Sequence, residues 1–296
     1  MSRTEEDKNI SDIAEKWVKI GIFGNLALAV VKGWAGLVSN SSAMIADAVN
    51  SASDVLSSLF IFASLKIAKK PADKKHPYGH YKVEVIASMV IGLMLGILAY
   101  QVVVNGINII IGGLYSTPGS QALYVALISI AAKEVLYRFT YKAGVEANSP
   151  ATIANAKDHR SDVIATSATF VGVLGARMGH PILDPIASII VSGFIAKMAF
   201  EVMMDAIGQI LDESVDEEKI KEIEELAEDV DGVVGTHDIR VRRSGSVYLV
   251  DMDIEVPPYL TIKEAHNICE VVRKKIFNSM NKTREVRVHI DPSRES

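Results

Sequence analysis

The run VEVIASMVIGLMLGILAYQVVVNGINIII, residues 83–111, is longer than the ~20 apolar residues that cross the hydrocarbon core of a bilayer. It contains one acidic residue, Glu84, and no lysine or arginine. An apolar run of this length with almost no charge is typical of a transmembrane helix. Residues 83–111 therefore predict that the chain is an integral membrane protein.

Five further apolar runs have similar length. The six predicted spans are roughly Trp17–Leu37, Ala43–Ile67, Val83–Ile111, Ala122–Tyr141, Ile153–Met178 and Ile182–Ile210. The links after the first, third and fifth spans contain no lysine or arginine, whereas residues 66–82, KIAKKPADKKHPYGHYK, are rich in lysine. Because lysine and arginine are enriched in cytoplasmic loops, we predict six membrane-spanning helices with both termini in the cytoplasm.

The composition excludes several classes of protein. The chain has 296 residues, is 49% hydrophobic and carries a formal net charge of −5. This acidic balance, without a basic patch, argues against nucleic-acid binding. The single cysteine, Cys269, excludes an internal disulfide framework and a CxxC metal motif. No HExxH, GxSxG or GxGD motif is present, so the chain is not expected to be an enzyme.

The long apolar runs end just before Asp212, and the residues after it are typical of a soluble domain. This change predicts a transmembrane domain over residues 1–211 and a cytoplasmic domain over residues 212–296. Apolar residues at helical spacing follow: Ile220, Ile223, Leu226, Ala227 and Val230. THDIRVRRSG and SVYLVDMDIEV then alternate around a Ser-Gly turn and predict a β-hairpin. A helix at about Ile262–Phe277 and a strand in REVRVHID complete the order αββαβ, which predicts a small α/β, ferredoxin-like domain.

Two of the predicted spans carry acids at helical spacing. In ADAVNSASD, residues 46–54, Asp47, Asn50 and Asp54 share one helical face. In KDHRSD, residues 157–162, Asp158 and Asp162 lie one turn apart. An acid near a helix start can simply favour the positive helix end, which would explain Asp158 but not Asp54. Since ionisable residues at membrane depth are usually functional, we predict a four-ligand metal site between these two helices.

Two further clusters are candidate metal sites. The loop PADKKHPYGHYK offers Asp73, His76 and His80, which form either a metal site or an ordinary solvated loop. The predicted cytoplasmic domain offers histidines and acids on its strands and second helix: His237, Asp253, His266, His289 and Asp291. Residues i and i+2 of a strand share a face, so His289 and Asp291 point the same way.

The six spans, ADAVNSASD, HPYGH, KDHRSD and the αββαβ tail together resemble the cation diffusion facilitator family. NSPATIANA and KKPADKKHPYGH also resemble its magnetosome members, which are associated with iron. The resemblance implies a homodimeric transporter that exports divalent transition metals from the cytoplasm in exchange for protons. It implies a bacterial inner membrane, or an internal membrane derived from it, with lipid around the spans.

The resemblance also implies roles for individual residues. It assigns a transport site to Asn50, Asp54, Asp158 and Asp162, and a loop site to Asp73, His76 and His80. It assigns a cytoplasmic-domain site to His237, Asp253, His266, His289 and Asp291. Lys82 and Asp212 match a salt bridge near the junction of the two domains and the dimer interface. The only cofactors expected are the bound ions themselves, Mn²⁺, Fe²⁺ or Zn²⁺.

The predicted transport ligands are one amide and three carboxylates. Oxygen ligands suit Mn²⁺, whereas imidazole suits Zn²⁺ better, so we predict Mn²⁺, followed by Fe²⁺. Asp47, one turn before Asn50, is a candidate outer ligand. His159 is expected at the solvated rim, and an inward His159 would favour zinc. The alternatives are a Zn²⁺/Cd²⁺ exporter of the same family and a regulatory or scaffolding membrane protein that transports nothing.

Overall fold

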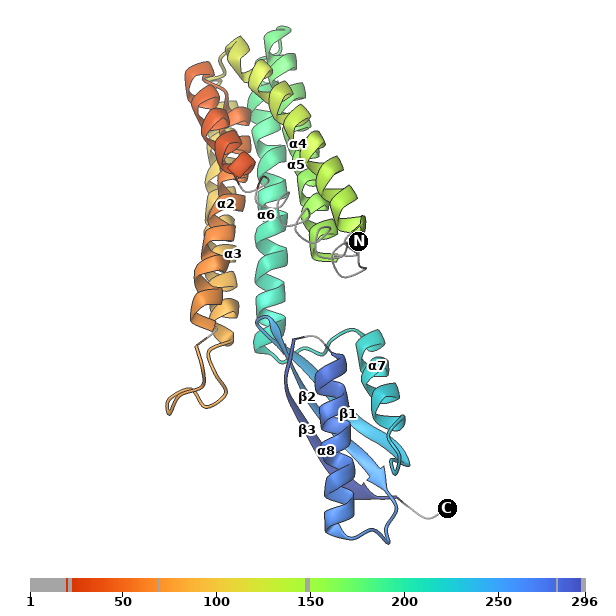
Figure 1. Ribbon diagram of the computed structural model, residues 1–296. Helices are drawn as coiled ribbons and strands as arrows, with labels where there is room; N and C mark the ends of the chain where they lie inside the picture. Colours follow the sequence, from red (N-terminus) through yellow and green to blue (C-terminus); the bar gives the residue numbers. More distant parts are fainter. Residues whose placement is uncertain (1–19, 21–22, 69, 147–149, 281, 294–296) are drawn as a thin grey trace. The chain divides into compact units, whose positions relative to one another are not determined.

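The computed structural model describes residues 20, 23–68, 70–146, 150–280 and 282–293 (Figure 1). The chain divides into two compact units. The first comprises Met1–Phe60 and Ile91–Glu201, and the second comprises Ile61–Val90 and Val202–Ser296.

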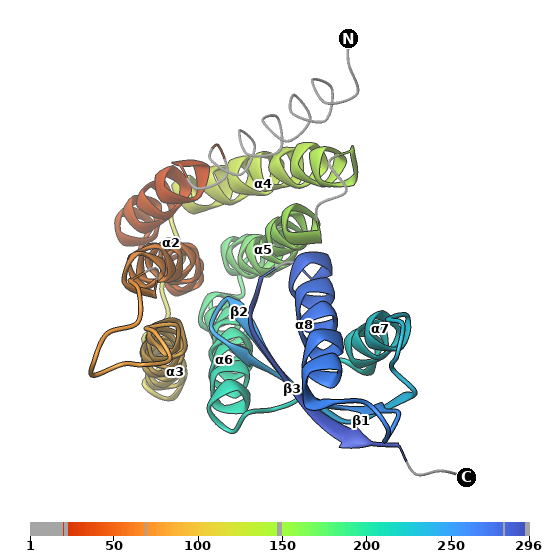
Figure 2. The same ribbon diagram turned by 60° about the horizontal axis from the view of Figure 1, so that its bottom comes forward.

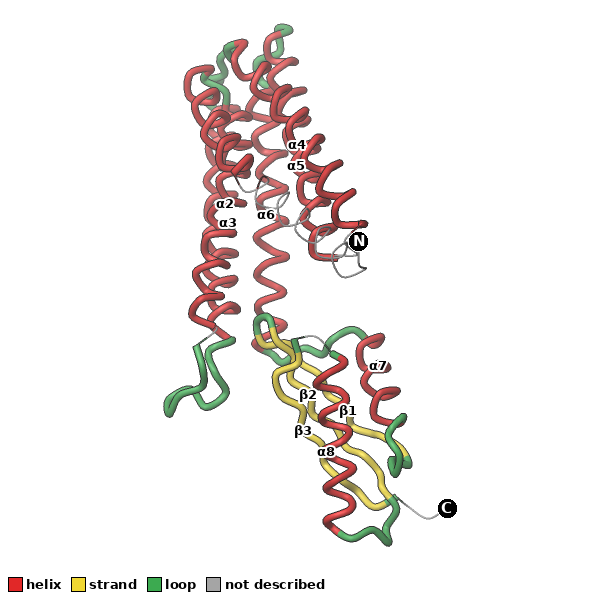
Figure 3. The backbone as a smooth tube through the Cα atoms, in the orientation of Figure 1, coloured by secondary structure: helices red, strands yellow, loops and turns green. Residues whose placement is uncertain are grey.

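The described part of the first unit is helical, as Figure 3 shows. Each predicted span contains a helix, although residues 17–19, 21 and 22 of the first span lie outside the described residues. The helices are Phe23–Ser39, α2 (Ser42–Ala68), α3 (Lys82–Ile111), α4 (Ser120–Glu146), α5 (Pro150–Arg177) and α6 (Leu183–Ile210), of which α2, α3 and α6 continue into the second unit.

Two described helices, α3 and α6, are long and apolar enough to cross a membrane by length and composition. Helix Phe23–Ser39 is apolar but shorter. Helices α2, α4 and α5 carry polar and charged side chains on buried faces, which lowers their mean hydropathy. Six membrane-spanning helices therefore remain a prediction.

Small side chains bring the helices of the first unit close together. A core of buried residues links several helices, and it consists of Ala35, Ala43, Met44, Ala122, Val125, Ala126, Val173 and Ala187. A Cβ atom built on Gly172 would lie 2.2 Å from the Cβ of Ala187, so only glycine permits this approach of α5 to α6. Helix association in membranes depends on such close backbone packing.

A buried carboxylate from α6 caps the start of α2. Asp184 Oδ1 accepts a hydrogen bond from Ser41 Oγ at 2.6 Å. Asp184 Oδ2 accepts from both the backbone nitrogen and the hydroxyl of Ser42, each at 2.6 Å. A negative charge at a helix N-terminus satisfies free N–H groups and interacts favourably with the helix dipole. Asp184 thus joins α6 to α2 at one end of the helical unit.

The α/β part of the second unit has the predicted order of elements, with α7 (Glu217–Glu228), β1 (Gly235–Ser244), β2 (Val247–Val256), α8 (Ile262–Ser279) and β3 (Thr283–Pro292). The predicted hairpin is confirmed, because β1 and β2 pair antiparallel. Strand β3 pairs parallel with β2, giving the strand order β1-β2-β3. The turn between β1 and β2 contains Gly245 at φ +61°, a left-handed conformation that favours glycine.

Helices α7 and α8 cover one face of this sheet (Figure 2). Alternate β2 residues, Val250, Met252, Ile254 and Val256, are buried against these helices. Asp251, Asp253 and Glu255 alternate with them and therefore point to the opposite, open face. The sheet thus separates an apolar core from a face that carries acids.

Candidate metal sites

The first predicted ligands to meet across two helices are Asn50 of α2 and Asp162 of α5. Both side chains are buried, and Asn50 Nδ2 donates a hydrogen bond to Asp162 Oδ1 at 3.2 Å. Sequence alone predicted these faces from the spacing in ADAVNSASD and KDHRSD. The contact shows that α2 and α5 do turn these two faces toward each other.

A lysine from α4 also reaches Asp162. Lys133 is 0% exposed, and its ammonium donates to Asp162 Oδ2 and, at 2.7 Å, to Asn25 Oδ1. The carboxylate that was predicted to hold a metal therefore has a buried cation beside it. Sequence reasoning missed Lys133 and Asn25. The available signal was a lone lysine within the apolar part of the fourth span.

Asp47 belongs to a separate buried network one turn along α2. Lys32 Nζ lies 2.9 Å from Asp47 Oδ2 and donates to Ser51 Oγ at 3.1 Å and Thr166 Oγ1 at 3.0 Å. The Thr166 hydroxyl in turn donates to Asp47 Oδ1 at 3.0 Å. All four side chains are fully buried. Asp47, predicted as an outer metal ligand, is thus paired with Lys32, and Lys32 lies inside rather than extending to the membrane surface.

The structure reverses one detail of the α5 prediction. His159 was expected at the solvated rim, but it is 2% exposed, and neither ring nitrogen has a hydrogen-bond partner among the described residues. Asp158 is exposed and Asp54 is half-buried. The buried stripe of α5 runs through Ala156, His159 and Asp162, because helical periodicity puts positions three apart on one face.

Charged residues connect α4 to the same end of α5. Arg138 Nε donates to Glu134 Oε1 at 2.8 Å, one helical turn away on α4. Arg160 donates to Glu134 Oε2 at 2.6 Å. The Arg160 guanidinium also lies 5.2 Å from the centre of the Tyr137 ring. Arg160 therefore serves as a link between α4 and α5.

The predicted loop residues do converge. His76 Nδ1 lies 3.2 Å from Asp73 Oδ1, and His80 Nε2 lies 3.4 Å from Asp73 Oδ2. The two imidazole rings lie 4.5 Å apart. One ligand atom from each residue fits within a 4.8 Å group, which is a spacing suited to one metal ion. Gly79, at φ +91°, makes the turn that returns His80 to Asp73.

Backbone hydrogen bonds fix the loop carboxylate. Asp73 Oδ1 accepts from the backbone nitrogens of His76 and Lys75, at 2.7 and 2.8 Å. These bonds hold the pKa of the Asp73 carboxyl below its usual range, and the bond from the His76 backbone has the largest effect. Asp73 is therefore ionised at neutral pH and able to act as a metal ligand.

A second group forms on the open face of the α/β domain. His237 Nε2 lies 3.2 Å from Asp291 Oδ2 and 4.0 Å from Asp253 Oδ2, and these three can share one ion. The three residues lie on three neighbouring strands. His237 of β1 pairs in register with Asp253 of β2, and Asp291 lies on β3, which pairs with the other edge of β2. Glu255, which sequence reasoning missed, lies 3.7 Å from His237 Nδ1.

Two other predicted residues of this domain lie differently. His289 Nε2 approaches the other oxygen of Asp291 at 3.3 Å and borders the group. His266 is exposed on α8, which packs against the opposite face of the sheet. The structure does not bring His266 to the group within one chain, because the sheet lies between them.

The predicted partners Lys82 and Asp212 were expected to form a salt bridge. Asp212 Oδ2 accepts from Arg242 at 2.8 Å. Asp212 takes a left-handed backbone conformation, φ +56°, at the turn after α6. A bond between Lys82 and Asp212 remains a prediction.

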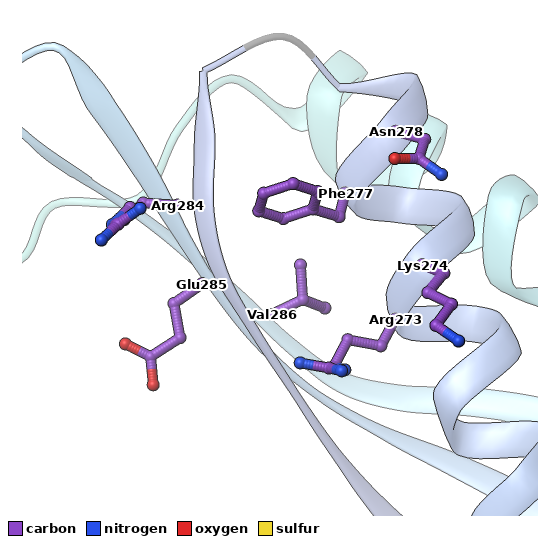
Figure 4. Close-up of a pocket in the computed structure, with 7 residues that line it drawn as sticks. All are labelled: Arg273, Lys274, Phe277, Asn278, Arg284, Glu285 and Val286. Atoms are coloured by element: carbon purple, nitrogen blue, oxygen red, sulfur yellow. The ribbon is translucent and has the colours of Figure 1, made fainter.

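A pocket of about 280 Å³ lies between α8 and β3 (Figure 4). Its lining residues are Arg273, Lys274, Phe277, Asn278, Arg284, Glu285 and Val286. Three basic side chains and one carboxylate do not form a set of metal ligands. The pocket is therefore unrelated to the candidate metal sites.

Comparison with known proteins shows the family to which the chain is similar. Residues 18–211 match the family model described as "Cation efflux transmembrane domain", and residues 215–293 match "Cation efflux protein, cytoplasmic domain". A manganese efflux system protein, MneP, of Bacillus subtilis is 37% identical over 95% of this chain and 96% of its own. The magnetosome protein MamB of Magnetospira sp. is 35% identical over 92% and 93%. Metal tolerance protein 2 of rice is 35% identical over 94% of this chain and 78% of its own.

The chain belongs to the cation diffusion facilitator family.

Membership of the cation diffusion facilitators decides several broader points. These proteins are transporters rather than enzymes, as the sequence predicted. The chain is an integral membrane protein with a cation-efflux transmembrane domain. The resemblance that ADAVNSASD, HPYGH and KDHRSD indicated is confirmed across nearly the whole chain.

Proposed function

We propose that this chain exports Mn²⁺ from the cytoplasm in exchange for protons, through Asn50, Asp54, Asp158 and Asp162. The observation that carries the proposal is the buried contact between the Asn50 amide and the Asp162 carboxylate, at 3.2 Å. Both side chains carry oxygen atoms that can bind a cation, the Asn50 amide once it turns its oxygen inward, and Asp54 and Asp158 each lie one turn from this contact. A site of one amide and three carboxylates suits hard ions better than zinc. Similarity to a protein named for manganese efflux supports the same choice.

Proton exchange follows from the chemistry of the ligands. Carboxylates bind a metal ion in their deprotonated form, so protons and metal compete for the same oxygen atoms. In an alternating-access cycle, protons from the outside would displace the ion there and be released on the cytoplasmic side. Asp54 and Asp162 are the carboxylates proposed for this exchange.

Two variants in proteoliposomes test the transport site. Asp54→Ala should abolish Mn²⁺ uptake driven by a proton gradient, while the protein remains folded and dimeric by size-exclusion chromatography. Lys197→Gln is the control, because Lys197 is exposed on α6 and forms a salt bridge with Glu201, away from the proposed ligands. Full activity of Asp54→Ala would refute the site.

Fe²⁺ is the next candidate substrate, and one observation favours Zn²⁺ or Cd²⁺. His159 is buried three residues before Asp162, and both of its ring nitrogens lack hydrogen-bond partners among the described residues. If one nitrogen joined the site, the ligand set would suit zinc. Uptake of Mn²⁺, Fe²⁺ and Zn²⁺ should be compared in the same vesicles, and uptake of Zn²⁺ alone would refute the oxygen-site argument. A scaffolding protein would move none of them.

The other two metal groups are proposed as regulatory sites. His237, Asp253 and Asp291 are proposed to bind cytoplasmic metal and to draw two copies of the domain together. The group at Asp73, His76 and His80 is proposed as a second cytoplasmic site. We propose a homodimer in the bacterial inner membrane, or an internal membrane derived from it, with both termini in the cytoplasm. The lysine-rich loop supports this orientation.

A further inference from the structure

Lys133 is a fully buried cation in contact with a proposed metal ligand. Its ammonium is 0% exposed and lies between the Asp162 carboxylate and the Asn25 amide oxygen. Removing a charge from water costs several kcal/mol, so a buried lysine persists only where partners compensate it. If Asp162 acted only as a metal ligand, it would not need the buried Lys133 of α4 beside it.

Both oxygens of Asp162 are occupied by donors from the chain itself. Lys133 donates to Oδ2, and Asn50 donates to Oδ1 through its amide nitrogen at 3.2 Å. An amide nitrogen cannot coordinate a cation, so Asn50 must present its oxygen instead before it can bind metal. The same carboxylate must also loosen its bond with Lys133.

We propose that Lys133 is a tethered counter-cation, which holds Asp162 when the transport site is empty and competes with the metal ion for that carboxylate. The inference rests on the proposed function of Asp162 as a transport ligand. A transporter must bind its ion tightly enough to load and weakly enough to release it. Lys133 helps release, because its ammonium replaces the departing ion at Asp162.

Formal charges agree with this role. The proposed carboxylate ligands are Asp54, Asp158 and Asp162, and Asp47 lies one turn before Asn50. Among the described residues, Lys32 pairs with Asp47 and Lys133 pairs with Asp162. Fully ionised, the six groups leave an excess of two negative charges, which equals the charge of one divalent cation. Lys32 contacts Asp47 rather than Asp162, so it is a buried lysine of the same region without the proposed competition.

The kinetics of Lys133→Gln test the proposal. Mn²⁺ uptake into proteoliposomes should show a KM about tenfold lower than that of the unmodified chain, which corresponds to about 1.4 kcal/mol. The kcat should fall as well, because the ion leaves Asp162 more slowly. A purely structural lysine would lower the amount of folded protein without lowering KM. An unchanged or raised KM in folded Lys133→Gln would overturn the proposal.

Lys133→Arg keeps the test decisive if Lys133→Gln does not fold. A guanidinium keeps the charge and can grip a carboxylate with two hydrogen bonds, so KM should rise. An unchanged or lowered KM in this variant would count against competition. Lys32→Gln is the control for loss of a buried charge. If its KM fell as much as that of Lys133→Gln, competition at Asp162 would be refuted.

Asp54→Ala separates this inference from the proposed function. If Asp54→Ala is inactive and Lys133→Gln has an unchanged KM, the transport site stands and the role of Lys133 fails. If Asp54→Ala transports normally, the proposed site itself fails, and any change in Lys133→Gln has another cause.

Discussion

At the scale of single residues, the proposed transport site depends on which side chain of α5 points inward. Asp162 and His159 lie on its buried stripe, whereas Asp158 is exposed. A buried imidazole without partners is costly, so natural proteins usually give such a group a hydrogen bond or a function. His159 is therefore the residue that tests metal selectivity most directly.

His159→Asn should leave the KM for Mn²⁺ within about twofold, or about 0.4 kcal/mol, if the site uses oxygen ligands alone. The reason is that asparagine keeps a polar side chain but removes both ring nitrogens. Initial rates of Mn²⁺ and Zn²⁺ uptake in proteoliposomes provide the measurement. A large loss of Zn²⁺ uptake with Mn²⁺ uptake intact would identify His159 as a zinc ligand.

At the scale of elements, two caps define helix ends that matter for the sites. Asp184 caps α2, the helix that carries Asn50 and Asp54. Thr261 caps α8, whose apolar face forms the core beneath the sheet. Both caps satisfy backbone N–H groups that have no partner within their own helix.

Asp184→Ala should lower the free energy of unfolding by about 1.5–3 kcal/mol, the usual contribution of a hydrogen bond to a charged group. The start of α2 would lose the bonds at Ser42 and at the buried hydroxyl of Ser41. Thermal unfolding of the purified protein in detergent measures the effect. The melting temperature of Asp184→Asn should lie between those of the unmodified chain and Asp184→Ala. Equal melting temperatures for all three proteins would contradict the role of Asp184 as a cap.

Thr261→Ala should destabilise the α/β domain by about 1 kcal/mol at neutral pH, because it removes an N-cap. The Thr261 hydroxyl and backbone hold the pKa of the Glu264 carboxyl below its usual value. Because this pKa is lowered in the folded protein, the stabilisation from ionised Glu264 is complete above the ordinary glutamate pKa. It is lost as the pH falls through the pKa of Glu264 in the folded protein. Melting curves of the full chain should therefore differ more at pH 7 than at acidic pH.

At the scale of the whole molecule, the chain combines a cation-efflux transmembrane domain with a cytoplasmic domain that carries its own candidate metal group. The acids of that group, Asp253 and Asp291, lie on an open sheet face, where a second copy or a metal ion can reach them. Metal that draws two such domains together would favour one state of the dimer, provided that it binds that state more tightly.

His237→Ala combined with Asp253→Ala should therefore weaken transport at low Mn²⁺ more than at saturating Mn²⁺. The two substitutions remove ligands without touching the core of the domain. The dose response of uptake is the measurement, and Asp251→Ala is the matched control, because Asp251 shares the open face but not the group. Unchanged dose-response curves would mean that the domain serves dimerisation and does not sense metal.

The sequence alone determined the αββαβ domain, the positions of the helices and the family, because these depend on periodicity and on motifs that lie close together in the chain. It also predicted the helical faces on which Asn50 and Asp162 meet, since spacing decides which residues share a face. Only the tertiary structure decided what those faces meet. Lys133 and Asn25 come to Asp162 from other helices, and His159 is inside although its charged neighbours suggested the rim. Helix rotation and packing set such contacts, and one helix's periodicity carries no information about the side chains of the next.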